Sequence, residues 1–146
     1  MKAPEKVPES LLLDTHIWFW LVTGHERLAQ NAVLLKAIEL AADRGRLWLS
    51  AISVWEIAML EVKGRLQLGR RCESWMAEAL EKSRIRLAPL DPTVSILSTR
   101  LEGFFYADPA DRMIAATAID NGWRLVTADQ RLGEYMAEKK MGVWGV

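Results

Sequence analysis

Short apolar runs alternate along this chain with longer segments in which apolar residues recur every three or four positions. Continuous apolar runs predict strands over residues 11–13, 47–49, 85–88 and 124–127, with residues 143–144 as an added edge strand. Helical spacing predicts helices over residues 15–22, 28–42, 51–63, 75–80, 94–101, 108–121 and 129–139. Strands that alternate with helices indicate parallel pairing through helical crossovers. The fold class we expect is α/β, a three-layer α/β/α sandwich around a mostly parallel sheet of four to five strands.

The pattern indicates one domain. Residues 1–10 are polar and carry two prolines, so we interpret them as a lead-in, and residues 11–146 as a single domain. No apolar stretch reaches the length of a membrane span, and we expect no membrane partner. Cys72 is the sole cysteine, which excludes an intramolecular disulfide and fits a cytoplasmic setting.

One predicted helix has an unusual aromatic run. Trp18, Phe19 and Trp20 are consecutive, and three adjacent residues point in three directions around a helix. At least one of them should therefore meet another element or another chain.

Composition and charge narrow the function little. The chain has 146 residues, 51% of them hydrophobic, and Lys plus Arg equal Asp plus Glu at 19 each. Zero formal net charge argues neither for nor against a nucleic-acid partner, so any phosphate contacts depend on local patches. Four arginines could form such phosphate-binding patches, or could equally be solvated surface charges. They are Arg65, Arg70, Arg71 and Arg131.

Four acids are placed where α/β sheets form sites. Asp14 follows the first predicted strand and Asp129 follows the fourth. Glu56 lies in the helix after the second strand, and Asp111 opens the helix that leads into the fourth. Sites in such sheets form at the carboxyl ends of the strands. If the first and fourth strands are neighbours, the four carboxylates converge at one edge.

Each acid also has a purely structural explanation. Asp14 and Asp129 could cap the helices that follow them, and Thr127 with Gln130 offers a rival cap. Asp108 could cap the helix that contains Asp111, whose carboxylate would then face the positive end of the helix dipole. Ser53 and Glu56 fit the capping-box spacing.

Glu56 is the acid for which a purely structural role, such as capping, is the weakest explanation. It shares a helix face with Ile52, Met59 and Leu60, so its carboxylate interrupts an apolar stripe. A charge in such a place should be paired or bound to a cation.

The chemistry that fits four carboxylates is binding of a hard divalent cation. The sequence has no Cys/His cluster for zinc, no Ser or Cys nucleophile motif beside a histidine, and no nucleotide-binding glycine loop. Carboxylates suit Mg²⁺ or Mn²⁺, ions that activate water in phosphodiester cleavage.

The order of these motifs resembles that of PIN-domain proteins, most closely the VapC-type ribonuclease toxins of bacterial toxin–antitoxin pairs. The resemblance covers nearly the whole chain after about residue 10 and rests on four segments. They are Leu11-Leu12-Leu13-Asp14-Thr15, Ser53-Val54-Trp55-Glu56-Ile57-Ala58, Asp108-Pro109-Ala110-Asp111-Arg112 and Leu125-Val126-Thr127-Ala128-Asp129.

The resemblance implies a catalytic and metal-binding role for Asp14, Glu56, Asp111 and Asp129. It also implies supporting or substrate-contacting positions, namely Thr15, Asp108, Arg112 and Thr127. The implied protein is a Mg²⁺- or Mn²⁺-dependent endoribonuclease that cleaves single-stranded or loop RNA in the cytoplasm. Its implied partners are a cognate antitoxin and a second copy of itself in a homodimer.

Three other interpretations compete with this one. Some relatives process RNA without an antitoxin, and a non-catalytic module could keep the fold and bind RNA or protein. A phosphorelay receiver is also an acidic-edged α/β domain, but it needs paired acids after its first strand. Here Thr15 follows Asp14, which disfavours a receiver.

Overall fold

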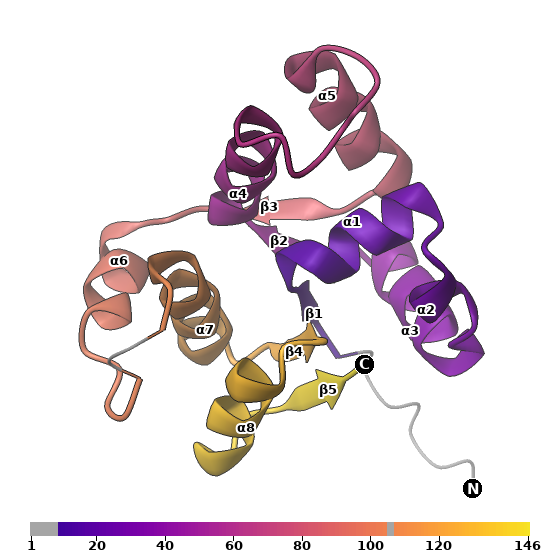
Figure 1. Ribbon diagram of the computed structural model, residues 1–146. Coiled ribbons are helices and arrows are strands. Elements are labelled where there is room, and N and C mark those ends of the chain that lie inside the picture. Colours follow the sequence, from indigo (N-terminus) through magenta and orange to yellow (C-terminus); the bar gives the residue numbers. More distant parts are fainter. Residues whose placement is uncertain (1–8, 105–106) are drawn as a thin grey trace, which may run out of the picture.

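Five parallel strands form one sheet at the centre of the molecule (Figure 1). The computed structural model describes residues 9–104 and 107–146. The strands are β1 (Leu11–Leu13), β2 (Leu47–Ser50), β3 (Arg86–Ala88), β4 (Arg124–Thr127) and β5 (Val143–Gly145). Their order in the sheet is β3-β2-β1-β4-β5, and every neighbouring pair is parallel. The predicted fold class is confirmed, and β1 and β4 are neighbours.

Helices connect the strands and cover both faces of the sheet. They are α1 (Thr15–Thr23), α2 (Glu26–Ala29), α3 (Ala32–Asp43), α4 (Ala51–Val62), α5 (Cys72–Ser83), α6 (Pro92–Ser98), α7 (Pro109–Asn121) and α8 (Gln130–Glu138). The single helix expected over residues 28–42 was wrong. The chain leaves the helix after Ala29, and the Asn31 side chain accepts a hydrogen bond from Leu34 N to start α3.

The sheet separates two apolar layers because successive strand residues point to opposite faces. Leu11 and Leu13 pack in a cluster with α1, α3 and α5. Leu12, between them, belongs to the cluster on the other face, which α7 and α8 cover. Figure 1 shows these two groups of helices on either side of the strands.

The aromatic run of α1 packs mainly within the chain. Trp18 is fully buried and meets Trp75 of α5 edge-on, with ring centroids 5.7 Å apart. Phe19 also packs on Trp75, and Trp20 stacks on His25. The expected contacts with other elements are confirmed. All three aromatic rings pack against side chains of this chain, on Trp75 or His25.

Two expectations concern the ends and the environment of the chain. Most of the predicted lead-in, residues 1–8, lies outside the described residues. Across residues 9–104 and 107–146, no helix combines the length and apolarity needed to cross a bilayer.

Candidate active site

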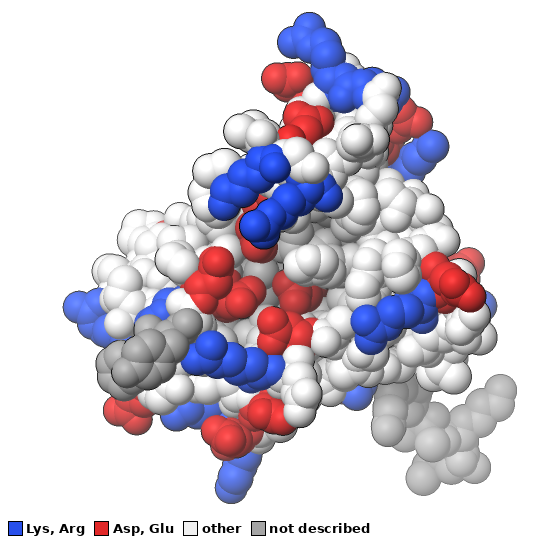
Figure 2. All heavy atoms as spheres, viewed as in Figure 1, with Lys and Arg blue, Asp and Glu red and all other residues white. Residues whose placement is uncertain are grey.

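The carboxyl ends of β1 and β4 bring several acids to one edge of the sheet. Leu13 pairs with Val126 in the parallel register, so Asp14 and Thr127 leave the two strands side by side. The helices α4 and α7 begin near the same edge and carry Glu56 and Asp111. Figure 2 shows acidic side chains gathered at the middle of this face, with basic side chains around them.

Asp14 is the acid most firmly held by the fold. It is only 5% exposed, and it caps α1 by accepting a hydrogen bond from Thr15 N at 2.8 Å. Its other oxygen accepts a hydrogen bond from Thr127 Oγ1 at 2.7 Å. Burial raises the pKa of Asp14, while the bonds from Thr127 and Thr15 lower it. Asp14 is therefore both a helix cap and a buried carboxylate fixed at the edge.

Glu56 is tied to the same place through a hydroxyl group. Thr15 Oγ1 donates to Glu56 Oε1 at 2.5 Å and lies 2.7 Å from Ser53 Oγ. Burial raises the pKa of Glu56, the Thr15 bond lowers it, and nearby Asp14 raises it. The capping-box alternative for Ser53 and Glu56 was wrong, because Ser50 is the N-cap of α4. Ser53 contacts Thr15 instead, a role that the sequence interpretation missed.

Asp111 lies third in α7, close to the other carboxylates of the site. Burial, followed by repulsion from Asp14, Glu56, Asp129 and Asp108, raises its pKa to about 7. No described residue donates a hydrogen bond to its carboxylate, whereas each of the other acids accepts at least one; these are Asp14, Glu56, Asp108 and Asp129. Its oxygens are therefore available to a ligand.

Asp108 and Asp129 combine capping with proximity to the site. Both are exposed N-caps: Asp108 accepts from Ala110 N at 2.8 Å, and Asp129 accepts from Leu132 N at 2.9 Å. The predicted capping roles are thus present in both. Each cap uses one carboxylate oxygen, and the other accepts no hydrogen bond from the described residues.

The donor set fits a hard divalent cation in charge and in chemistry. Every candidate ligand is a carboxylate. Burial and then repulsion between carboxylates raise the pKa values of Glu56 and Asp111, a cost that a bound cation would offset. Within the described part of the chain, no three acidic, histidine or cysteine side chains already converge in metal-binding geometry. Cation binding would therefore require the carboxylates to draw closer together.

Basic groups near the site have mixed roles. His16 is exposed, and its charge lowers the pKa of Asp14 and of Glu56. Arg112 donates to the Ser98 carbonyl at 3.4 Å, a contact with α6. Of the four arginines considered for phosphate contacts, Arg70 and Arg71 form exposed ion pairs with glutamates. The other two, Arg65 and Arg131, are exposed.

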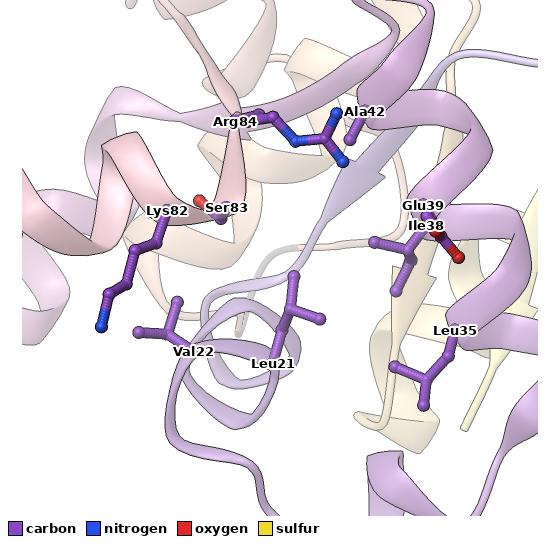
Figure 3. A pocket seen from close by; sticks show the side chains of 9 residues that line it. All are labelled: Leu21, Val22, Leu35, Ile38, Glu39, Ala42, Lys82, Ser83 and Arg84. Carbon is purple, nitrogen blue, oxygen red and sulfur yellow. The ribbon is translucent and has the colours of Figure 1, made fainter.

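Figure 3 shows a largely apolar groove elsewhere on the chain, which none of the candidate site acids lines. It is a cavity of about 440 Å³ between α1, α3 and the end of α5. Its wall combines apolar side chains with three charged ones, and the lining residues are Leu21, Val22, Leu35, Ile38, Glu39, Ala42, Lys82, Ser83 and Arg84. None of the candidate site acids takes part in it.

Comparison with known proteins gives a match over most of the chain. The PIN domain family matches residues 11–137. Ribonuclease VapC22 of Mycobacterium tuberculosis is 38% identical over 135 residues, which cover 92% of this chain and 98% of that protein.

Solved structures share the fold at low sequence identity. VapBC from Salmonella typhimurium bound to DNA has a TM-score of 0.67 at 19% identity, over 94% of this chain and 98% of that chain. VapBC2 from Rickettsia felis, bound to a promoter DNA fragment, has a TM-score of 0.65 at 17% identity, over 92% and 97%.

Proposed function

The chain belongs to the PIN-domain family, and from this premise we propose that it is a metal-dependent endoribonuclease acting as the toxin of a toxin–antitoxin pair. The observation that carries the proposal is the group of carboxylates at the β1–β4 edge, with the pKa of Asp111 raised to about 7. A relative named as a ribonuclease, 38% identical over 92% of the chain, supports the same activity.

The roles of the four acids follow from how each is held. Asp14, Glu56, Asp111 and Asp129 would hold Mg²⁺ or Mn²⁺, with Asp111 the most available because it accepts no hydrogen bond from the described residues. When bound, the cation supplies activation of water and neutralisation of phosphate charge. Thr127 and Thr15 orient Asp14 and Glu56 through hydrogen bonds.

The substrate we propose is single-stranded or loop RNA. Unstacked nucleotides can enter a recessed edge, whereas an A-form duplex hides its bases in a deep groove. Arg112 is the basic residue nearest in sequence to Asp111, and we assign it a phosphate contact once it leaves Ser98. With an RNA substrate, we propose that the protein acts in the cytoplasm.

A protein partner and a second copy complete the proposal. Two structural neighbours are VapBC assemblies, and the apolar groove of Figure 3 offers this chain a surface for an amphipathic antitoxin segment. The homodimer is proposed from the family and from exposed apolar residues on α4, Trp55 and Val62.

The experiment that tests the nuclease is cleavage of a mixed RNA panel in EDTA, then with Mg²⁺, Mn²⁺ or Ca²⁺ restored. We expect no cleavage in EDTA, recovery with Mg²⁺ or Mn²⁺, and much less with Ca²⁺. Attack by water with the 3′-oxygen as leaving group leaves 5′-phosphates and 3′-hydroxyls. Full activity in EDTA, or a 2′,3′-cyclic phosphate product, would contradict the mechanism.

A second experiment separates a toxin from an RNA-processing nuclease. Expression of the parent chain alone in a bacterial host should arrest growth, and the Asp14→Asn variant at the same level should not. A parent that cleaves RNA in vitro but leaves growth unchanged would favour the processing role.

A further inference from the structure

We infer that Ser53 is a positioning residue of the acidic site, which aligns the Thr15 hydroxyl so that its proton points at Glu56. This inference rests on the proposed metal-dependent function and adds a residue to it. Three side chains form the arrangement, from the start of α1 and the first half of α4. Thr15 Oγ1 lies 2.7 Å from Ser53 Oγ and 2.5 Å from Glu56 Oε1.

The direction of the two hydrogen bonds follows from counting protons. An ionised carboxylate can only accept, and a hydroxyl group has one proton to donate. Thr15 uses its proton on Glu56, so Ser53 must donate its own proton to Thr15. The chain therefore runs from Ser53 to Thr15 to Glu56.

Burial makes this direction a fixed property of the site. Ser53 is 0% exposed and Thr15 is 2% exposed, so solvent has little access to either hydroxyl group. Without Ser53, the Thr15 oxygen would lose its donor in a buried position, and its hydroxyl could rotate away from Glu56.

The consequence for Glu56 is a choice between its two oxygens. Oε1 accepts from Thr15, while Oε2 has no hydrogen-bond partner among the described residues. The chain from Ser53 thus presents one defined oxygen to a cation. A similar arrangement holds Asp14, because Asp129 N donates to Thr127 Oγ1 at 3.0 Å and Thr127 donates to Asp14 at 2.7 Å.

Helix capping does not explain the position of the Ser53 hydroxyl, because another serine caps α4. Ser50 caps α4 by accepting from Ile52 N at 3.2 Å. Ser53 lies three residues before Glu56, on the same side of the helix, and its hydroxyl meets Thr15 of another element. Ser50 is also 0% exposed and therefore provides a matched control at the N-cap of the same helix.

The test is calorimetric titration of Mn²⁺ into the parent, Ser53→Ala and Ser50→Ala proteins, with a thermal melt of each metal-free protein. Loss of a group that orients a metal ligand typically lowers affinity about 10–100-fold. We expect a loss of about 10-fold for Ser53→Ala, at the low end of that range. Ser50→Ala should lower the melting temperature through its lost cap but leave Mn²⁺ affinity within about 2-fold of the parent.

A double variant tests whether Ser53 acts through Thr15. In a Thr15→Val background, Ser53→Ala should cause no further loss of Mn²⁺ affinity, because the hydroxyl that it orients is gone. If Ser53→Ala does not fold, Ser53→Cys keeps a small side chain with a weak donor and should show an intermediate loss.

The outcomes separate this inference from the proposed function. Equal Mn²⁺ affinity of Ser53→Ala and Ser50→Ala, beside a parent that binds Mn²⁺, would overturn the role of Ser53 alone. Additive losses in the Thr15→Val background would also overturn it. A parent that neither binds Mn²⁺ nor cleaves RNA would overturn the proposed function and this inference together.

Discussion

Asp111 shows at the level of one residue how a site opposes folding. Its pKa is raised to about 7 by burial and by neighbouring carboxylates, from an ordinary value of 3.8. The unfolded chain therefore ionises this group at lower pH than the folded chain does. Stability that is present below about pH 4 is lost as the pH rises toward 7, because the ionised form is disfavoured in the fold.

The first prediction is that metal-free Asp111→Asn melts at a higher temperature than the parent at pH 8. Asn cannot ionise, so the variant escapes the repulsion from Asp14 and Glu56. The gain should shrink toward zero near pH 4, where the parent carboxyl is protonated. Thermal melts in EDTA at both pH values measure it. A variant less stable than the parent at pH 8 would contradict the repulsion.

Asp14 gives the second prediction, which concerns activity. Asp14→Asn should reduce RNA cleavage by more than roughly 100-fold, the upper end of what changes around a metal ligand cost. The fold should persist, since Asn is also a good N-cap for α1. Single-turnover cleavage and circular dichroism measure the two properties. Activity within 10-fold of the parent would remove Asp14 from the proposed site.

Ser53 and Glu56 mark where the sequence interpretation fell short. Their spacing fits a capping box, and nothing local distinguishes that pattern from two side chains that both meet Thr15. The contact joins positions 38 residues apart, so only the packing of α1 against α4 determines it. Asp108 and Asp129 were easier, because a cap depends on adjacent residues.

At the level of the element, two glycines allow the effect of backbone conformation on stability to be measured apart from the effect of side-chain packing. Gly122 ends α7 with a φ of 66°, and an added Cβ would meet nothing within 4 Å. Gly133 lies inside α8, where an added Cβ would make an ordinary contact with Thr127 at 3.7 Å. Neither site is crowded, so substitution tests the backbone.

The third prediction is that Ala at these two positions has opposite effects on the free energy of unfolding. Gly122→Ala should lower it by about 1 kcal/mol, because the left-handed conformation disfavours a side chain. Gly133→Ala should raise it by about 0.5–1 kcal/mol through helix propensity. Urea unfolding at pH 5, with EDTA, measures both. Equal signs would contradict the left-handed end of α7 at Gly122 or the helical position of Gly133 within α8.

Element types followed from periodicity, and element boundaries did not. The predicted helix over residues 28–42 has a continuous apolar stripe, yet the structure breaks it before Asn31. Leu28 packs in the core from α2, so the apolar spacing continues across the break. A capping asparagine was the available signal, and it competed with an uninterrupted period.

The whole molecule presents apolar surface on α4 that its own core does not cover. Val62 is 78% exposed and Trp55 is 54% exposed, on a helix with few charged residues. Such a helix suits an interface better than solvent. The proposed homodimer therefore has a candidate face that the aromatic run of α1, packed inward, does not provide.

The fourth prediction is that Val62→Lys weakens the dimer. The parent should sediment as a dimer at tens of micromolar, and Val62→Lys should shift it toward monomer by placing a charge in the interface. Val33→Lys on α3, at a position 73% exposed, is the matched control and should leave the dimer intact. A parent that is monomeric, or equal effects of the two variants, would contradict this face.

Parallel pairing was predictable, because strands that alternate with helices are joined by helical crossovers. The pairing of β1 with β4 was only a condition of the sequence interpretation, because short apolar runs do not define which strands are neighbours, and the structure supplies it. That pairing is what brings Asp14 and Asp129 to one edge. The distances between carboxylates could not be predicted, since they depend on side-chain packing across four elements.

Calorimetric titration of Mn²⁺ into the parent, Asp111→Asn and Asp120→Asn proteins tests the central claim most directly. Asp120 lies exposed on the same helix, away from the site edge, and controls for loss of one charge. If the carboxylates form one cation site, Asp111→Asn should lose more than roughly 10-fold in Mn²⁺ affinity. Asp120→Asn should match the parent. Equal affinity of all three proteins, or no Mn²⁺ binding by the parent, would contradict a shared metal site.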